Sequence, residues 1–66
     1  MNNLEQVDKV LRVQDVTQMT GLSKASVYRL IKLSDFPKQF KLGSRAIGWR
    51  MSSVKAWIDN RASQND

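Results

Sequence analysis

Hydrophobic positions near the start of the chain repeat with the period of a helix. The stretch Leu-Arg-Val at 11–13 reads as an extended entry, and the residues after it, 14–20, follow a helical pattern. The residues on the common face are Val13, Val16, Met19 and Thr20. Gly21 comes next, and glycine tolerates the left-handed conformation at a helix end. The pattern predicts a short helix that stops at Gly21.

A second helical pattern covers 24–34. Ser23 precedes it, and serine is a good N-cap because its hydroxyl accepts a hydrogen bond from a free N–H of the first turn. The apolar side carries Val27, Leu30 and Ile31. Asp35 and Pro37 should end this helix, because the residue before a proline avoids the helical region.

The period then changes to two, which is the period of a strand. Phe40 and Leu42 alternate with polar residues, and Ile47 and Trp49 do the same after the loop Gly-Ser-Arg-Ala at 43–46. Two alternating runs joined by a short glycine-containing loop predict a β-hairpin.

The segment 51–62 returns to the helical period, with Ser52 or Ser53 as the expected cap. Its apolar positions are Val54, Trp57 and Ile58. We expect Trp49 and Trp57 to pack in the core. The predicted fold class is therefore α+β, mostly helical, in the order helix, helix, β-hairpin, helix. We expect one domain over 10–61, with flexible ends at 1–9 and 62–66.

The two first helices have the spacing of a DNA-binding helix-turn-helix. Counting from Val16, the turn and apolar residues fall at +5, +6, +11 and +14: Gly21, Leu22, Val27 and Leu30. Thr17 and Thr20 depart from the usual pattern, which favours a very small residue and an apolar residue at these two places. The hairpin that follows makes this a predicted winged helix-turn-helix.

Composition narrows the chemistry. The 66 residues include no cysteine and no histidine, which excludes disulfides, zinc-finger ligands and Cys- or His-based catalysis. We expect no metal, no cofactor and no enzyme activity. No apolar run approaches the roughly 20 residues that span a bilayer, and the N-terminus does not resemble a signal peptide, so we expect a cytoplasmic protein without a membrane partner.

Positive charge is concentrated in the middle of the chain. The net charge is +5, and residues 24–50 alone hold seven lysines and arginines against Asp35, a net charge of +6. Clustered positive charge in a small domain is typical of nucleic-acid binding, although a solvated basic surface has the same composition.

Residues on the outer face of the second helix are the candidates for contacts in the major groove: Ser23, Lys24, Ala25, Ser26, Tyr28, Arg29 and Lys32. Arg29 can contact guanine with two hydrogen bonds, Lys24 can reach a guanine or a phosphate, and Tyr28 either caps the core or meets a phosphate. The candidate wing residues are Lys41, Ser44, Arg45 and Arg50. An arginine at a wing tip can enter a minor groove.

Three segments together resemble a known family: "LRVQDVTQMTGLSKASVYRLIK", "DFPKQFKLGSRAIGWR" and "SSVKAWIDNR". Over roughly 10–61 they are similar to the AlpA-type phage and prophage regulators, relatives of the excisionases with a MerR-like winged-helix domain. The resemblance implies a small protein of a phage, prophage or integrative element that binds double-stranded DNA. Such a protein regulates transcription or, as an excisionase, bends DNA for an integrase.

The expected partners beyond DNA are an integrase, RNA polymerase or further copies of the chain on adjacent sites. A different class of function, an inhibitor that docks on another regulator, stays open at this stage.

Overall fold

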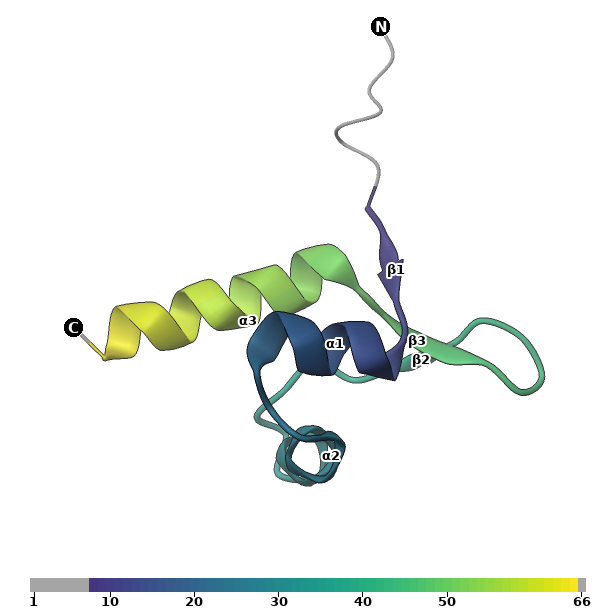
Figure 1. Cartoon of the computed structure of the whole chain (residues 1–66), viewed down its shortest axis with the longest axis horizontal. Coiled ribbons are helices and arrows are strands. Elements are labelled where there is room, and N and C mark those ends of the chain that lie inside the picture. The colour runs from purple at the N-terminus through teal and green to yellow at the C-terminus, as the bar shows by residue number, and fades with distance from the viewer. Residues whose placement is uncertain (1–7, 66) are drawn as a thin grey trace, which may run out of the picture.

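The computed structural model describes residues 8–65, so the expected flexible ends fall partly outside them, at 1–7 and 66. Over the described range, three helices pack around one small antiparallel sheet (Figure 1). The elements in chain order are β1 (Val10–Leu11), α1 (Val13–Thr20), α2 (Lys24–Lys32), β2 (Phe40–Lys41), β3 (Ile47–Arg50) and α3 (Met51–Gln64). This is the predicted α+β winged helix-turn-helix: α1 and α2 form the helix-turn-helix, and β2 and β3 form the wing.

The turn between α1 and α2 has the predicted chemistry at both ends. Gly21 adopts the left-handed conformation, with φ of 77°, and its N–H donates to the carbonyl of Thr17. Ser23 caps α2, because its Oγ accepts from the N–H of Ser26 at 3.1 Å. Figure 1 shows α2 nearly end-on below α1, which lies across the view, so the two helices cross steeply.

The sheet has one strand more than the predicted hairpin. β3 lies in the middle and pairs antiparallel with β2 on one side and β1 on the other. Leu11 stands opposite Trp49, and Lys41 stands opposite Ile47. Facing residues of an antiparallel pair share a side of the sheet, so these four side chains are on the side of the core. The extended entry expected at 11–13 thus begins as β1.

A core of six buried side chains joins all the larger elements: Leu11, Val16, Val27, Phe36, Trp49 and Val54. Trp49 is fully buried, as predicted, and its Nε1 donates to the carbonyl of Pro37 at 3.0 Å. Trp57 is only half-buried. It packs edge-on against Phe36, and its Nε1 donates to the carbonyl of Asp35.

The end of α2 differs from the prediction. The helix stops at Lys32, two residues early, because Ser34 takes the left-handed conformation with φ of 59°. The N–H groups of Ser34 and Asp35 then donate to the carbonyls of Ile31 and Leu30. This is the hydrogen-bond pattern of the Schellman motif, here with serine at the place where glycine is usual. A local motif therefore ends the helix before Pro37 does.

The start of α3 also corrects the prediction. The N-cap position belongs to Arg50, which makes no side-chain capping bond, and Ser52 and Ser53 lie inside the first turn. The N–H of Ser52 is satisfied from outside the helix by the carboxylate of Asp8, at 2.9 Å. At its other end α3 continues through Gln64, beyond the domain end expected at 61.

Candidate nucleic-acid interface

The outward face of α2 is basic and free of carboxylates. Its exposed side chains are those of Lys24, Ala25, Arg29 and Lys32. Val27 on the opposite face is fully buried, and this anchors the helix to the core. The helix therefore presents three cations on a surface whose orientation is fixed by packing.

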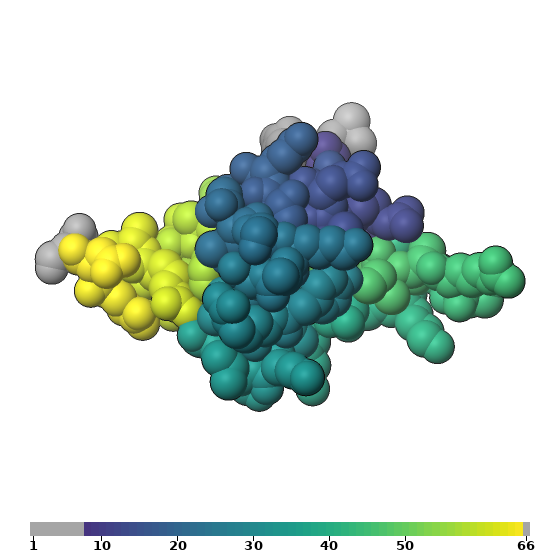
Figure 2. Space-filling view, turned by 60° about the horizontal axis from the view of Figure 1, so that its bottom comes forward, coloured from purple at the N-terminus to yellow at the C-terminus, as the bar shows by residue number. Residues whose placement is uncertain are grey.

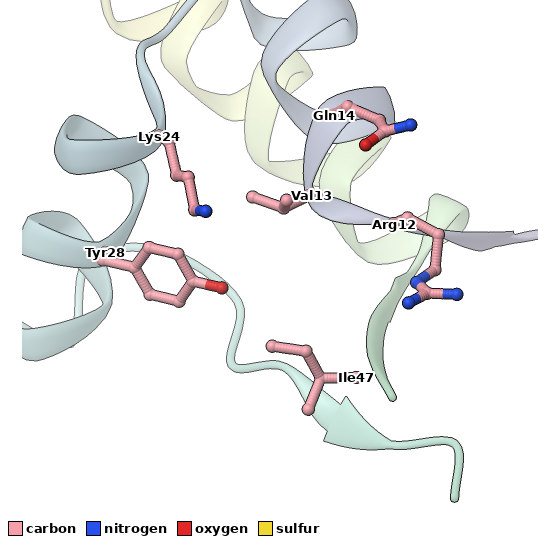
Figure 3. A pocket seen from close by; sticks show the side chains of 6 residues that line it. All are labelled: Arg12, Val13, Gln14, Lys24, Tyr28 and Ile47. Atoms are coloured by element: carbon pink, nitrogen blue, oxygen red, sulfur yellow. The ribbon is translucent and has the colours of Figure 1, made fainter. Parts of the chain in front are cut away.

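Two of the predicted residues on α2 have a second, structural task. Tyr28 is half-buried, and its ring lies 6.2 Å from the ring of Trp49 in a tilted arrangement. Ser26 is half-buried and takes part in the cap, because its Oγ accepts from the Oγ of Ser23 at 3.0 Å. The hydroxyls of the two serines are therefore engaged with each other, while the Tyr28 hydroxyl points from α2 into the space between Val13 and Ile47 (Figure 3).

The wing carries three exposed candidates, which are Lys41 at the end of β2 and Ser44 and Arg45 in the loop. The loop is closed by the N–H of Leu42, which donates to the carbonyl of Ala46 at 2.7 Å. Figure 2 looks at the α2 side: the teal helix occupies the centre, and the green loop extends beyond the body on one side. The outer face of α2 and the wing loop are therefore both accessible from this side of the molecule.

A surface hollow joins α2 to the base of the wing. It is lined by Ile31, Lys38, Gln39, Phe40, Lys41 and Ile47. Lys41 shares its side of the sheet with Ile47, and this places its ammonium group on the α2 side of the wing.

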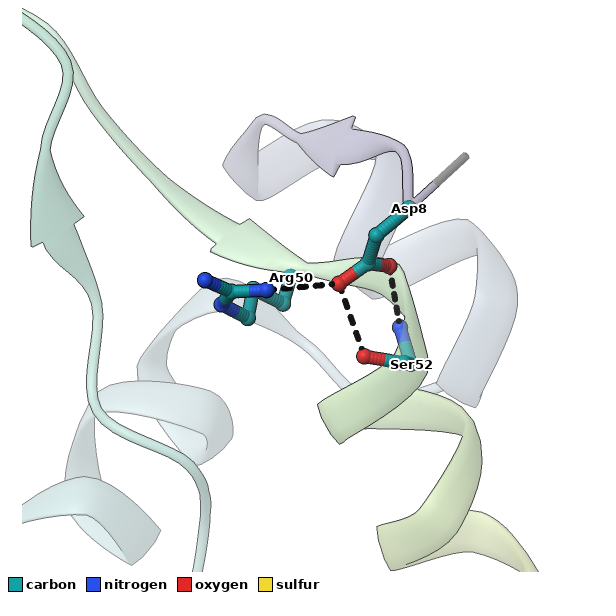
Figure 4. Close-up of polar contacts among 3 residues, drawn as sticks. All are labelled: Asp8, Arg50 and Ser52. Atoms are coloured by element: carbon teal, nitrogen blue, oxygen red, sulfur yellow. Dashed lines mark hydrogen bonds and ion pairs between the residues drawn. The ribbon is translucent and has the colours of Figure 1, made fainter. Parts of the chain in front are cut away.

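Arg50 does not join this surface. It follows the buried Trp49, so its side chain leaves the opposite side of the sheet. There its guanidinium forms an ion pair with Asp8, with NH1 at 3.2 Å from Oδ2 (Figure 4). The geometry separates Arg50 from the other ten candidates.

Asp8 makes several polar contacts, although the sequence analysis assigned it only to the N-terminal segment. Its carboxylate accepts from the Ser52 hydroxyl at 2.8 Å, from the Ser52 N–H and from Arg50. The pKa of Asp8 is lowered, first by the hydrogen bonds from Ser52 and then by the interaction with Arg50. The contact joins residues 44 positions apart, so no local pattern could reveal it.

A second hollow, of about 290 Å³, lies where α1, α2 and β3 meet (Figure 3). It is lined by Arg12, Val13, Gln14, Lys24, Tyr28 and Ile47. Arg12 and Gln14 were not among the predicted site residues. The sequence does contain a signal for them. Arg12 and Gln14 flank Val13, which begins α1 and itself lines the hollow.

The available donors suit an acidic partner. Arg, Lys, Tyr and Gln side chains of α2 and its neighbours line the two hollows, and no carboxylate lines either one. Among residues 8–65, no group of three His, Cys, Asp or Glu side chains is placed to hold a metal ion. None of the helices in that range has the length and apolar character needed to cross a membrane.

Comparison with known proteins confirms the resemblance drawn from the motifs. A family model described as prophage CP4-57 regulatory protein (AlpA) matches residues 9–62. Protein ORF88 of Enterobacteria phage P4, described as uncharacterized, is 39% identical over 54 residues, which cover 82% of this chain but 61% of that protein. The DNA-binding transcriptional activator AlpA of Escherichia coli (strain K12) is 31% identical over 67 residues, covering 92% of this chain and 94% of the activator. The chain belongs to the AlpA family of prophage regulatory proteins.

Proposed function

We propose that the chain binds double-stranded DNA sequence-specifically and regulates transcription of a phage, prophage or integrative element. The observation that carries the proposal is the basic, carboxylate-free face of α2, which lies on the same side of the molecule as the projecting wing. A helix of this kind fits the major groove, where its N-terminal half meets base edges. The name of the Escherichia coli relative, a DNA-binding transcriptional activator, supports the same reading.

The exposed residues divide into readers and positioners in this proposal. Arg29 donates two hydrogen bonds to a guanine, and Ala25 contacts a thymine methyl group. Lys32, one turn further along α2, lies beside the sugar-phosphate backbone. On the wing, Arg45 enters the adjacent minor groove, while Lys41 and Ser44 contact phosphates. Arg50 is left out because it is on the other side of the sheet.

The test starts from selection, because the target site is unknown. The purified chain selects duplexes from a random-sequence library, and fluorescence anisotropy then compares the selected duplex with a scrambled one. We expect the selected duplex to bind about a thousandfold more tightly or better. On both duplexes the affinity should fall steeply between about 50 and 200 mM salt. Equal affinity for both duplexes, or binding that salt does not weaken, would contradict the proposal.

The same assay tests Arg29. Arg29→Ala should cost about 1–3 kcal/mol on the selected duplex and little on the scrambled one, because a base contact exists only on the correct sequence. Lys55→Ala is the matched control, since it removes an exposed cation of α3 away from both hollows. An equal loss on both duplexes would make Arg29 a phosphate contact instead.

Bending assays address the excisionase alternative. A protein that prepares DNA for an integrase should bend the selected duplex and fill adjacent sites cooperatively, which a simple regulator need not do. RNA polymerase, an integrase and further copies of the chain are the partners to test on that DNA. Stable capture of another regulator without DNA would favour a docking inhibitor.

A further inference from the structure

The hollow at the junction of α1, α2 and β3 has the form of a small anion seat. Figure 3 shows the Lys24 ammonium group and the Tyr28 hydroxyl pointing into it from α2. The guanidinium of Arg12 and the amide of Gln14 stand on the opposite rim. Val13 and Ile47 form an apolar floor between the two sides. Polar donors from α2 and from the start of α1 therefore border one space, and those of Lys24 and Tyr28 point into it.

The donors in this hollow match one ligand chemistry. Two cations, a phenolic hydroxyl and an amide can all donate to an anionic oxygen, and no carboxylate in the lining competes with that anion. Charge-assisted hydrogen bonds from Arg and Lys to phosphate are among the strongest available to a protein surface. A volume of about 290 Å³ is large enough to admit a phosphate group.

The helical arrangement of α2 separates this seat from the base-reading surface. Lys24 and Tyr28 are four residues apart and face α1 and β3. Ala25 and Arg29 are also four residues apart, and they line a neighbouring hollow with Lys32; Tyr28, Ile31 and Gln39 complete its lining. Tyr28 therefore borders both hollows, whereas Lys24 borders only the first and Arg29 only the second. In a major groove, the Ala25 and Arg29 side of α2 would face the bases, and the Lys24 side would face the edge of the groove, where the backbone runs.

We infer that this hollow seats one phosphodiester of the DNA backbone, with Arg12 as a DNA-contacting residue and with Lys24 and Tyr28 as phosphate ligands rather than base readers. The inference rests on the proposed function and adds the division of labour along α2. Its consequence is that Arg12, Lys24 and Tyr28 set the position of the helix on any DNA, whereas Ala25 and Arg29 set the choice of sequence.

The variants Arg12→Ala, Lys24→Ala and Tyr28→Phe test the seat. Arg12→Ala should preserve the fold, because the backbone N–H of residue 12 makes the hydrogen bond to Asp15, not the side chain. Tyr28→Phe keeps the ring on Trp49 and removes only the hydroxyl. Thermal melts of all three variants check that the fold is intact.

Each charge-removing variant should lose affinity equally on the selected and the scrambled duplex. The loss of one phosphate contact reduces the fall in affinity between about 50 and 200 mM salt by about 3.5-fold, since the slope changes by about 0.9. Tyr28→Phe should lose affinity without a change of slope, because the hydroxyl carries no charge. Lys55→Ala, the control cation on α3, should behave as wild type.

Single methylphosphonate substitutions then locate the phosphate, because a methyl group replaces one charged oxygen. At one position the substitution should weaken wild type by about threefold or more and weaken Arg12→Ala clearly less, because only Lys24 and Tyr28 remain to contact that phosphate in the variant. If no position distinguishes the two proteins, or if Arg12→Ala binds like Lys55→Ala, the seat is refuted while the proposed function stands. A loss confined to the selected duplex would also refute it.

Free phosphate provides the last arm. Inorganic phosphate at constant ionic strength that displaces DNA from wild type more readily than from Arg12→Ala would support the assignment, because the free ion and the DNA phosphate then compete for one hollow. Binding of inorganic phosphate by wild type but not by Arg12→Ala, together with equal DNA affinity of the two proteins, would mean that the hollow takes the free ion, and the assignment to the DNA backbone would fail. If wild type bound no DNA in any assay, the proposed function and the seat would fall together.

Discussion

Substitution of the three glycines by alanine separates two physical reasons for a glycine. At Gly48 the reason is space: a Cβ would lie 2.8 Å from Val10 Cγ1, 2.9 Å from the Leu11 carbonyl oxygen and 3.1 Å from Leu42 Cδ1. At Gly21 the reason is conformation, because φ is +77° although no atom lies within 4 Å of the added Cβ. Gly43 has neither constraint, since its Cβ also meets nothing within 4 Å and its φ is not positive. It is the matched control.

The expected costs follow from these geometries. Gly48→Ala should destabilise by about 1–3 kcal/mol, as other overpacked sites do. The side chain of Val10 can rotate away, but the Leu11 carbonyl belongs to β1, which is paired with β3, and cannot. Gly21→Ala should cost about 1–2 kcal/mol, the price of a left-handed conformation with a Cβ. Gly43→Ala should be neutral or stabilise by up to about 1 kcal/mol, because it restricts the unfolded chain.

Thermal unfolding followed by circular dichroism measures the series. A change of 1 kcal/mol moves the melting temperature of a domain this small by roughly 4–8 °C, so Gly43→Ala should separate clearly from the other two variants. The order of stability should be Gly43→Ala highest, with Gly21→Ala and Gly48→Ala well below wild type. A melting temperature of Gly48→Ala within about 2 °C of wild type would show that β1 shifts freely on β3, and the reasoning about the sheet would be wrong.

Three further predictions concern Asp8, the wing and the last helix. Asp8→Asn should lower the melting temperature at pH 7, and the difference from wild type should disappear in acid: the pKa of folded Asp8 lies below the ordinary 3.8, so its stabilisation is present above 3.8 and is lost as the pH falls through the lower folded value. Arg45→Ala should leave the melt unchanged and lower the salt slope of DNA binding by about one unit, with a larger loss when A·T pairs flank the site; unchanged affinity on both flanks would remove the wing from the interface. Trp57→Ala should lower the free energy of unfolding by roughly 2 kcal/mol in a denaturant titration, which is less than the loss of a fully buried tryptophan, because Trp57 is half-exposed and the variant loses mainly the contact with Phe36. A loss above roughly 4 kcal/mol would mean that Trp57 supports the core as Trp49 does.

The parts of the fold that follow from local chemistry were predictable. Gly21 and Ser23 determine the turn of the helix-turn-helix through a left-handed residue and a side-chain cap, and both depend only on neighbours in sequence. The hairpin followed from the alternation around its loop. β1 was recognised only as an extended entry, because a two-residue strand is too short to show alternation. Its existence depends on pairing with β3, about 40 residues later.

The capping of α3 needed the same long-range information. Two serines near the start of a helical run are good N-caps by propensity, yet the helix begins at Met51, two or three residues earlier than a cap at Ser52 or Ser53 would give. The N–H of Met51 donates to the carbonyl of Lys9 at 2.8 Å, and the carboxylate of Asp8 takes the N–H of Ser52. Once the N-terminal segment supplies these acceptors, a serine cap is no longer required. Propensity gave the helix, and a tertiary contact set its first residue.

The wing shows where a sequence rule gives way to the sheet. Phe40 in β2 and Leu42 directly after it are exposed, at 40% and 42%, and the charged Lys41 between them lines a hollow with Ile31 of α2. Pairing with β3 enforces this arrangement, because Lys41 stands opposite Ile47 and Phe40 stands opposite Gly48. The absence of a side chain at Gly48 leaves room for Val10 and Leu42 to close over it on the outer side. An apolar strand would normally turn its hydrophobic residues to the core, so the register has a cost in burial and places a cation beside α2. Departures of this kind are expected where a surface serves binding, and the outward apolar residues of this strand therefore support the proposal that the wing contacts DNA together with α2.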